Sequence, residues 1–333
     1  MLAEYDVVAV GHAIVDVIAP AEPAFLEAES LPAGSMTLID QHRALNLYEK
    51  MAGRDEITQE SGGSAGNTIA GVASFGGKAA YIGKVAHDEL GEVFSRDLRR
   101  LGVKFDTPFL HDDPTATARC LINVTPDGQR TMATYLGAAA LVGPQDVDPA
   151  VVEAAKVTYL EGYLFDTPSG RAAFAKACEI ARAAGRQTAI TLSDSFVVDR
   201  WRTDLLAFIE RHIDLMFANE SEVLSFFQTD DFDTAVKYLR TKADLAFVTR
   251  SEKGSVAVTY DQVLPVEVCA AQVIDTTGAG DQYAAGVLYG LTQGLSVVDA
   301  GKLGSLAAAE VIGHYGPRPQ VSYGDLAKAR GLI

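Results

Sequence analysis

Cysteine, positive charge and long apolar runs are all scarce in this sequence. Only three cysteines occur in 333 residues, too far apart for a disulfide framework or a Cys-x-x-Cys metal site. Lys and Arg number 28 against 44 Asp and Glu, and the net charge of −16 argues against nucleic acid or an anionic membrane as a partner. No apolar run reaches the roughly 18 residues that a membrane-spanning helix needs.

The N-terminal residues also lack the basic segment and apolar stretch of a secretory signal. Scattered thiols suit a reducing compartment. A hydrophobic fraction of 48% is enough to form a folded core and excludes a disordered chain. We therefore expect a cytoplasmic protein, monomeric or homodimeric, whose partners are small molecules.

Short apolar runs alternate with segments of helical periodicity, most regularly after residue 150. This alternation predicts an α/β fold in which helices cover both faces of a mainly parallel sheet. The predicted strands are 5–10, 79–85, 157–161, 188–192, 215–218 and 246–249. The predicted helices are 41–51, 66–75, 89–101, 169–184, 200–212, 220–227, 232–241, 279–292 and 296–312.

Two segments, about 12–50 and 105–137, interrupt the alternation. The second contains the β-rich runs 117–124 and 131–135, joined by a Pro-Asp-Gly turn signal. A tight hairpin does not belong in a parallel sheet, so we expect these segments to form a small β-rich lid. The whole chain, 1–333, is then a single domain into which the lid is inserted.

The most specific motif is Asp-Thr-Thr-Gly-Ala-Gly-Asp at 275–281. Gly278, Ala279 and Gly280 leave their N–H groups open at a helix start, where the helix dipole favours an anion such as a phosphoryl group. Asp281 follows in the first turn and is placed to accept a proton from a substrate hydroxyl. The alternative is a plain helix cap by Thr277, but the doubled Thr, doubled Gly and preceding acid favour a site.

A second motif, Ser-Gly-Gly-Ser-Ala-Gly-Asn-Thr, occupies 61–68. Gly62 and Gly63 permit a ligand to approach the backbone closely. Asn67 can donate to and accept from a polyol. The alternative interpretation is a glycine-rich turn with Ser64 as the helix N-cap.

Together the two motifs resemble the signatures of the ribokinase-like (PfkB) family of carbohydrate and nucleoside kinases. The resemblance covers essentially the whole chain. It implies a three-layer α/β sandwich with a small lid, ATP as phosphate donor, Mg²⁺ and an activating K⁺. It also implies that Asp281 is the catalytic base and that Gly278, Ala279 and Gly280 form the anion hole.

The resemblance implies further roles. Acceptor hydroxyls would be bound by Asp16, Gly62, Gly63 and Asn67, with Asp16 just after the carboxyl end of a strand. Asn219 and Glu222 match the family's Asn-x-x-Glu motif, in which Glu222 organises Mg²⁺ through water. The same pair also reads as a helix capping box. ATP would contact Asn219, Glu222, Thr249, Gly254, Thr277 and His314, and a monovalent cation would lie near Asp275 and Thr277.

Within the family, the chain resembles the adenosine-kinase-like branch. Residues 130–138 are similar to that branch's Arg-Ser-Leu-x-x-Asn-Leu-Gly-Ala segment, which implies that Arg130 contacts phosphates in the closed state. Two departures stand out, Tyr135 in place of Asn and Gly66 in place of Gln, Thr or Ala. An apolar and aromatic slot for a purine would be formed by Met36, Leu38, Tyr135, Leu136, Tyr163 and Phe165. The alternative makes these ordinary core residues of the lid.

The leading hypothesis is therefore an ATP-dependent kinase that phosphorylates the 5′-hydroxyl of a ribonucleoside, first of all adenosine to AMP, a purine-salvage reaction. One alternative is the same chemistry on a free sugar such as ribose, fructose or a keto-deoxy sugar acid. Another is a non-catalytic binding module. The intact Asp281 and its Gly-Ala-Gly segment argue against the binding module, which has no need for a base.

Overall fold

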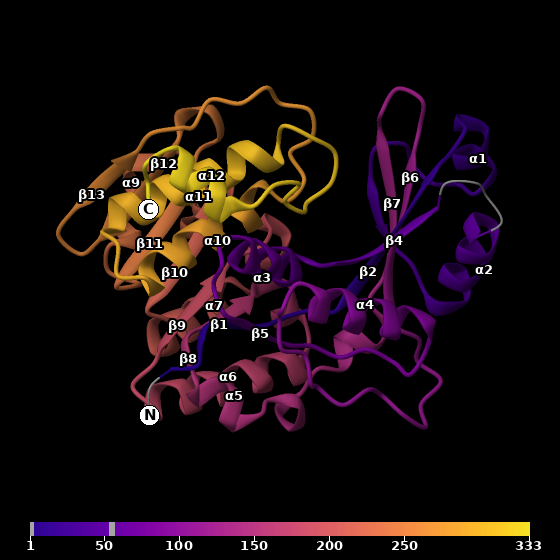
Figure 1. Cartoon of the computed structure of the whole chain (residues 1–333), viewed down its shortest axis with the longest axis horizontal. Coiled ribbons are helices and arrows are strands. Elements are labelled where there is room, and N and C mark those ends of the chain that lie inside the picture. Colours follow the sequence, from indigo (N-terminus) through magenta and orange to yellow (C-terminus); the bar gives the residue numbers. More distant parts are fainter. Residues whose placement is uncertain (1–2, 53–56) are drawn as a thin grey trace.

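A large, mostly parallel sheet lies at the centre of the computed structural model, which describes residues 3–52 and 57–333 (Figure 1). In that part of the chain the sheet is eight-stranded, in the order β13-β12-β11-β10-β9-β8-β1-β5. The parallel strands are β1 (Tyr5–Val10), β5 (Ala79–Ile82), β8 (Ala155–Glu161), β9 (Gln187–Thr191), β10 (Leu215–Asn219) and β11 (Leu245–Thr249). The antiparallel edge is β12 (Ser255–Thr259) and β13 (Val263–Val266).

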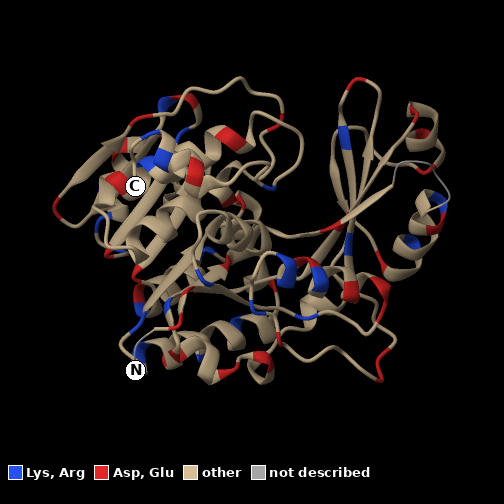
Figure 2. Cartoon of the chain, viewed as in Figure 1, with Lys and Arg blue, Asp and Glu red and all other residues tan. Residues whose placement is uncertain are grey.

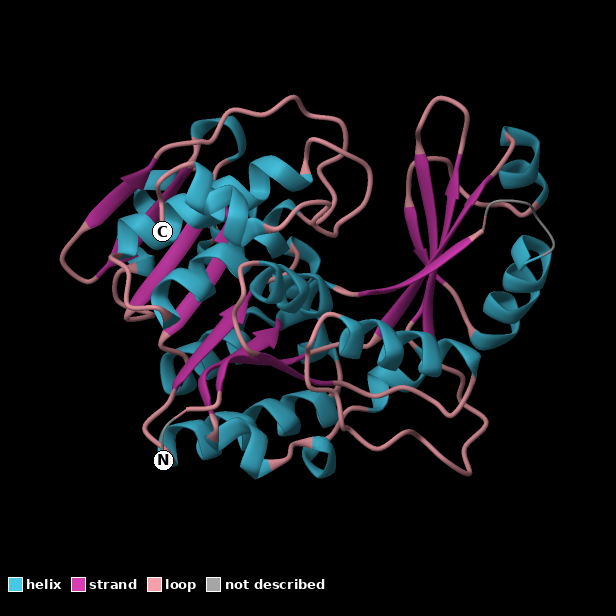
Figure 3. Ribbon diagram, in the orientation of Figure 1, coloured by secondary structure: helices cyan, strands magenta, loops and turns pink. Residues whose placement is uncertain are grey.

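Helices cover both faces of this sheet (Figure 3). Alternate residues of β1 point to opposite sides, so Val7 packs into one core and Val8 into another. The first side carries α3 (Ser64–Ser74), α10 (Ala279–Thr292), α11 (Val297–Val311) and α12 (Tyr323–Ala329). The second carries α5 (Pro149–Glu153), α6 (Pro168–Ala183), α7 (Ser195–His212), α8 (Glu220–Phe227) and α9 (Phe232–Leu239). The predicted α/β sandwich is confirmed.

A second, five-stranded sheet lies to one side, in the order β3-β7-β6-β2-β4 (Figure 1). Its strands are β2 (Ile14–Pro20), β3 (Met36–Leu38), β4 (Thr58–Gly62), β6 (Ala118–Val124) and β7 (Arg130–Tyr135). Strands β6 and β7 form the hairpin that the Pro-Asp-Gly signal predicts. Strand β4 lies outside the two segments that were expected to form the lid.

The two faces of the second sheet differ. On one face, Val15, Val17, Leu121 and Ala133 pack into the core with α2 (Gln41–Ala52) and α4 (Glu89–Arg100). The other face turns toward the large sheet and carries a mixture of apolar and polar side chains. The remaining helix, α1 (Pro23–Ala28), follows β2.

Acidic residues are spread widely over this architecture (Figure 2). Asp and Glu residues are distributed over both sheets and their helices (Figure 2), so the charge of −16 is not confined to one region. No helix among residues 3–52 and 57–333 is both long and apolar enough to cross a bilayer.

Candidate active site

A cavity of about 470 Å³ lies between the carboxyl ends of the large sheet's strands and the inner face of the second sheet. Its walls come from β2, β6 and β7 on one side, and from β8–β11 and the starts of α3 and α10 on the other. In a parallel α/β sheet this edge is where ligands bind, because the loops there converge on the helix N-termini.

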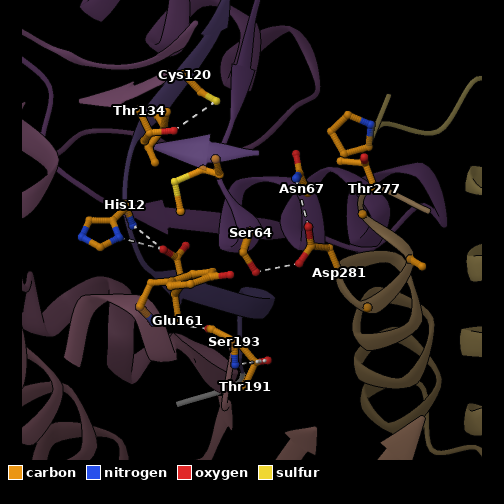
Figure 4. A pocket seen from close by; sticks show the side chains of 18 of the residues that line it. His12, Ser64, Asn67, Cys120, Thr134, Glu161, Thr191, Ser193, Thr277 and Asp281 are labelled. Carbon is orange, nitrogen blue, oxygen red and sulfur yellow. Dashed lines mark hydrogen bonds and ion pairs between the residues drawn. The ribbon is translucent and has the colours of Figure 1, made fainter. Parts of the chain in front are cut away.

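Asp281 joins the two sequence motifs inside this cavity. Its Oδ1 accepts a hydrogen bond from the Ser64 hydroxyl at 2.6 Å, and its Oδ2 accepts one from the Asn67 amide at 3.0 Å (Figure 4). Ser64 is therefore the first residue of α3 rather than its cap, and Gly63 precedes it. Burial raises the pKa of Asp281 to about 6, although the bonds from Ser64 and Asn67 oppose the shift. With a pKa of about 6, most of this carboxylate is ionised at neutral pH, which is the form that can accept a proton.

The glycine-rich segment before Asp281 forms an open helix start. Gly278 has φ +78°, and a Cβ there would lie 2.7 Å from the Cα of Pro317, so only glycine fits. Residues 276–280 all line the cavity. Thr277 does not cap α10. Its N–H and hydroxyl instead donate to Asp275 Oδ1 at 3.0 and 2.6 Å.

Asp275 and Arg130 connect this segment to the second sheet. Asp275 Oδ2 accepts the N–H of Gly316 at 3.0 Å and pairs with Arg130 Nη1 at 3.2 Å. Asp275 itself is not part of the cavity wall, whereas Arg130 is. Arg130 Nε is buried and has no partner among the described residues. The guanidinium therefore lines the cavity with an N–H group that is available to a ligand.

Asp16 lies within β2, not in a loop after a strand as expected, and opposite Glu60 and Cys120 in the sheet register. It is 9% exposed and faces the cavity. Burial and then the charge of Glu60 raise its pKa to about 7, and Arg318 and Arg130 oppose the shift. A Cβ on Gly62 would lie 2.4 Å from Asp16 Oδ2, so Gly62 makes room for this carboxylate and does not itself line the cavity.

His12 and Glu161 form a buried pair that the sequence analysis missed. Glu161, the last residue of β8, accepts from His12 Nδ1 at 3.0 Å and from the His12 N–H at 3.3 Å (Figure 4). It also accepts from the Ala65 N–H at 2.9 Å. Both side chains line the cavity. Their signal was available, because His12 follows the carboxyl end of one predicted parallel strand and Glu161 is the last residue of another.

The same cavity is also lined by a group of apolar and aromatic side chains, here called the slot. The rings of Tyr163 and Phe196 lie 5.9 Å apart on the side of the large sheet. Phe196, at the start of α7, was not predicted. The second sheet and the segment after it contribute Met36, Leu38, Met132 and Leu136. At 44% and 56% exposed, Met36 and Leu38 remain accessible to a ligand.

Two residues assigned to this slot lie elsewhere. Along β7, Arg130, Met132 and Thr134 face the cavity, so Tyr135 points to the opposite side, where its hydroxyl donates to Gln41 at 2.6 Å. Phe165 is 2% exposed and packs on Phe208 in the core of the other layer. Strand alternation and the short 3₁₀ turn at Gly162–Asp166 account for both corrections.

The Asn219–Glu222 capping box is confirmed. Asn219 donates through its N–H and amide to the two Glu222 oxygens at 2.9 and 2.8 Å, and the Glu222 N–H donates back at 2.8 Å. Burial raises the pKa of Glu222 to about 7. These two residues and Thr249 line the cavity.

Gly254 and His314, both expected to contact ATP, are not part of this wall. Gly254 has φ +79° in the tight turn before β12, where a Cβ would meet the Val266 carbonyl at 2.5 Å. His314 pairs with Glu310 at 3.2 Å and lies against the Tyr315 carbonyl. Both residues serve local structure in this conformation.

Comparison with known proteins agrees with this geometry. The sequence profile of the "pfkB family carbohydrate kinase" matches residues 6–322. The chain belongs to the pfkB carbohydrate kinase family. The described fold is that of these kinases, and ATP is the family's phosphate donor.

Several pfkB relatives resemble the chain along much or all of its length. A crystal structure described as adenosine kinase from Sinorhizobium meliloti is 50% identical, with a TM-score of 0.89 over 98% of this chain and 100% of that one. A probable sugar kinase from Rhizobium etli CFN 42 is 47% identical, with a TM-score of 0.90 over 100% of both chains. Probable fructokinase-3 of Arabidopsis thaliana is 28% identical over 72% of this chain and 71% of its own length.

Proposed function

We propose that this pfkB kinase phosphorylates the 5′-hydroxyl of a ribonucleoside, converting adenosine to AMP with ATP as donor. The observation that carries the proposal is the set of side chains that line one cavity. It places Asp281 and the glycine-rich helix start beside an apolar slot between the Tyr163 and Phe196 rings and the second sheet. A planar base suits such a slot, whereas a free sugar would leave it empty.

The chemistry follows from the groups around Asp281. The acceptor oxygen attacks the γ-phosphorus of ATP in line, its proton passes to the Asp281 carboxylate, and the bond from phosphorus to the departing ADP oxygen breaks. Ser64 and Asn67 hold the carboxylate in place. The N–H groups of 278–280 stabilise the negative charge of the transferring phosphoryl group.

Acceptor orientation is proposed to come from the polar floor of the cavity. Asp16 faces the cavity with no hydrogen-bond partner within the described residues, so its two oxygens are free to bind vicinal ribose hydroxyls. The Gly63 backbone and Asn67 line the same floor. With the base in the slot and the ribose on Asp16, the 5′-hydroxyl would point toward Asp281.

The residues present fit a water-mediated Mg²⁺ site. Both Glu222 oxygens already accept hydrogen bonds from Asn219, so Glu222 would hold the ion through its water shell. Bound Mg²⁺ neutralises charge on the ATP phosphates. A K⁺ near Asp275 and Thr277, bound by carbonyls there and in 309–318, would strengthen the field at 278–280. Equal rates in K⁺ and in a bulky organic cation would dismiss the K⁺ site.

A sugar acceptor is the second candidate, because the polar side chains of His12, Asp16 and Glu161 in the cavity wall also suit a free sugar. ADP release should be measured with adenosine, ribose, fructose and a keto-deoxy sugar acid. We expect the highest kcat/KM with adenosine. A higher value with any of the sugars would establish the sugar kinase, and no ADP with any acceptor would leave a binding module.

A further inference from the structure

Arg318 is a half-buried cation that the proposed chemistry does not yet use. It lies in the segment between α11 and α12, and its Nη2 donates to the carbonyl of Ser61 and to the Ser61 hydroxyl, the latter at 3.2 Å. Its Nε and Nη1 are buried and have no partner in the described part of the chain, and no direct ion pair neutralises it there. A guanidinium whose buried N–H groups lack partners costs free energy of desolvation unless its charge interacts favourably with other groups.

Arg318 also gives a physical reason for the glycine at position 66, where the resemblance leads one to expect Gln, Thr or Ala. A Cβ on Gly66 would lie 3.5 Å from Arg318 Nη2, the single heavy atom within 4 Å of it. The guanidinium therefore occupies the space into which a side chain at 66 would extend. An Ala methyl group would make an ordinary contact there, but a Gln side chain would have to displace the guanidinium. Glycine at 66 and arginine at 318 fit together as a pair.

The backbone beside Arg318 is tied to both kinase motifs. The Pro317 carbonyl accepts from Gln282 Nε2 at 2.8 Å, and the same amide donates to the Asn67 carbonyl at 3.0 Å. Gly278 packs against Pro317, where no Cβ would fit. Gln282 and Pro317 thus attach the C-terminal segment to α3 and α10, and this fixes the position of the neighbouring Arg318.

The charge of Arg318 acts on both carboxylates of the acceptor site. It lowers the pKa of Asp16 and of Asp281 against the larger effect of burial. The other titratable or hydrogen-bonding groups that act on these three residues are Glu60 and Tyr81 near Arg318, Arg130 and Glu60 near Asp16, and Glu161, Ser64 and Asn67 near Asp281. Arg318 is the cation common to both carboxylates.

We infer that Arg318 is a positioning residue of the acceptor site, which holds the Ser61 backbone beside α3 and supplies the positive charge shared by Asp16 and Asp281, and that Gly66 is small in order to admit it. The inference rests on the proposed role of Asp281 as the base. It assigns a function to a segment that neither kinase motif contains.

The test is the pH profile of kcat/KM for adenosine in Arg318→Gln. Without the cation, both Asp16 and Asp281 should protonate at higher pH, so the acid limb, which reflects pKa values of about 7 and about 6, should move up. For each of the two carboxylates, a rise of one pKa unit would make the activity loss near pH 6 about fivefold larger than the loss near pH 8. Arg318→Lys keeps the charge but loses the contacts of Nη2 with Ser61, so its limb should stay in place while the acceptor KM rises. Arg330→Gln, an exposed arginine at the end of α12, is the matched control.

Gly66→Gln tests the same pH profile without changing Arg318. It replaces Arg318→Gln as the main variant if Arg318→Gln does not fold. It should shift the limb as Arg318→Gln does, whereas Gly66→Ala should not. An even loss at every pH in Arg318→Gln, or equal profiles for Gly66→Gln and Gly66→Ala, would overturn the inference. Asp281→Asn separates the two claims: if it is inactive while the limb of Arg318→Gln stays fixed, Arg318 alone is wrongly assigned.

Discussion

The two sheets of this kinase bury their strands in different ways. The strands of the large sheet are covered on both faces, so they read as continuous apolar runs, as in Val7–Val10. The second sheet packs one face on α2 and α4 and turns the other to the cavity, where Asp16, Arg130 and Thr134 replace apolar residues. In the proposed reaction, the large sheet and its helices would provide the base and the anion site, and the second sheet would provide Asp16 and Arg130.

The largest effect should come from the large sheet's side of the cavity. Asp281→Asn keeps the size of the side chain but cannot take a proton, so the rate should fall by about 10²- to 10⁴-fold or more while folding and ATP binding persist. Steady-state kinetics and a nucleotide-binding titration measure both. Near-normal kcat would remove Asp281 as the base.

On the second sheet, Asp16→Ala should weaken acceptor binding more than turnover. Asp16 would make two charge-assisted hydrogen bonds to ribose hydroxyls, each worth about 1.5–3 kcal/mol, so the acceptor KM should rise by at least roughly tenfold. 2′,3′-Dideoxyadenosine should be a similarly poor acceptor for the native enzyme. An acceptor KM within about twofold of the native value would refute the assignment.

Arg130→Ala tests whether the two sheets cooperate in the reaction. In this structure Arg130 pairs with Asp275, next to the anion site. If it meets the phosphates during transfer, its loss should lower kcat severalfold more than it raises the acceptor KM. A raised KM with unchanged kcat would make Arg130 a ground-state contact. Hydrogen exchange in 117–136 should slow when adenosine alone is bound, if the second sheet closes over it.

The smallest effects should show whether Phe196 or Tyr135 belongs to the binding slot. Phe196→Ala removes one ring of the slot and should raise the KM for adenosine more than that for ribose. Tyr135→Phe removes a hydroxyl that bonds only to Gln41 among the described residues, so adenosine kinetics should stay close to native. A large effect of Tyr135→Phe on adenosine KM would return Tyr135 to the binding slot.

Both sheets also show how far the sequence alone leads. The apolar runs predicted the six parallel strands of the large sheet, and the Pro-Asp-Gly turn predicted the hairpin. The two glycine motifs pointed to Asn67 and Asp281 separately, and their hydrogen bond emerged only from the structure. Strand β4 was missed because its residues, Thr-Gln-Glu-Ser-Gly, are polar, and β2 because it follows β1 after only three residues. Which way Tyr135 points depends on strand register, and the place of Arg318 depends on a long-range contact with Ser61. Neither leaves a local pattern in the sequence.

The central claim is that the slot beside Asp281 selects a nucleoside over a free sugar. The most direct measurement is a single reaction with labelled ATP and equal concentrations of adenosine, ribose and fructose, because the product ratio gives the ratio of kcat/KM values. The account predicts that AMP, phosphorylated at the 5′-oxygen, carries nearly all of the label. Label found mainly in a sugar phosphate would contradict it.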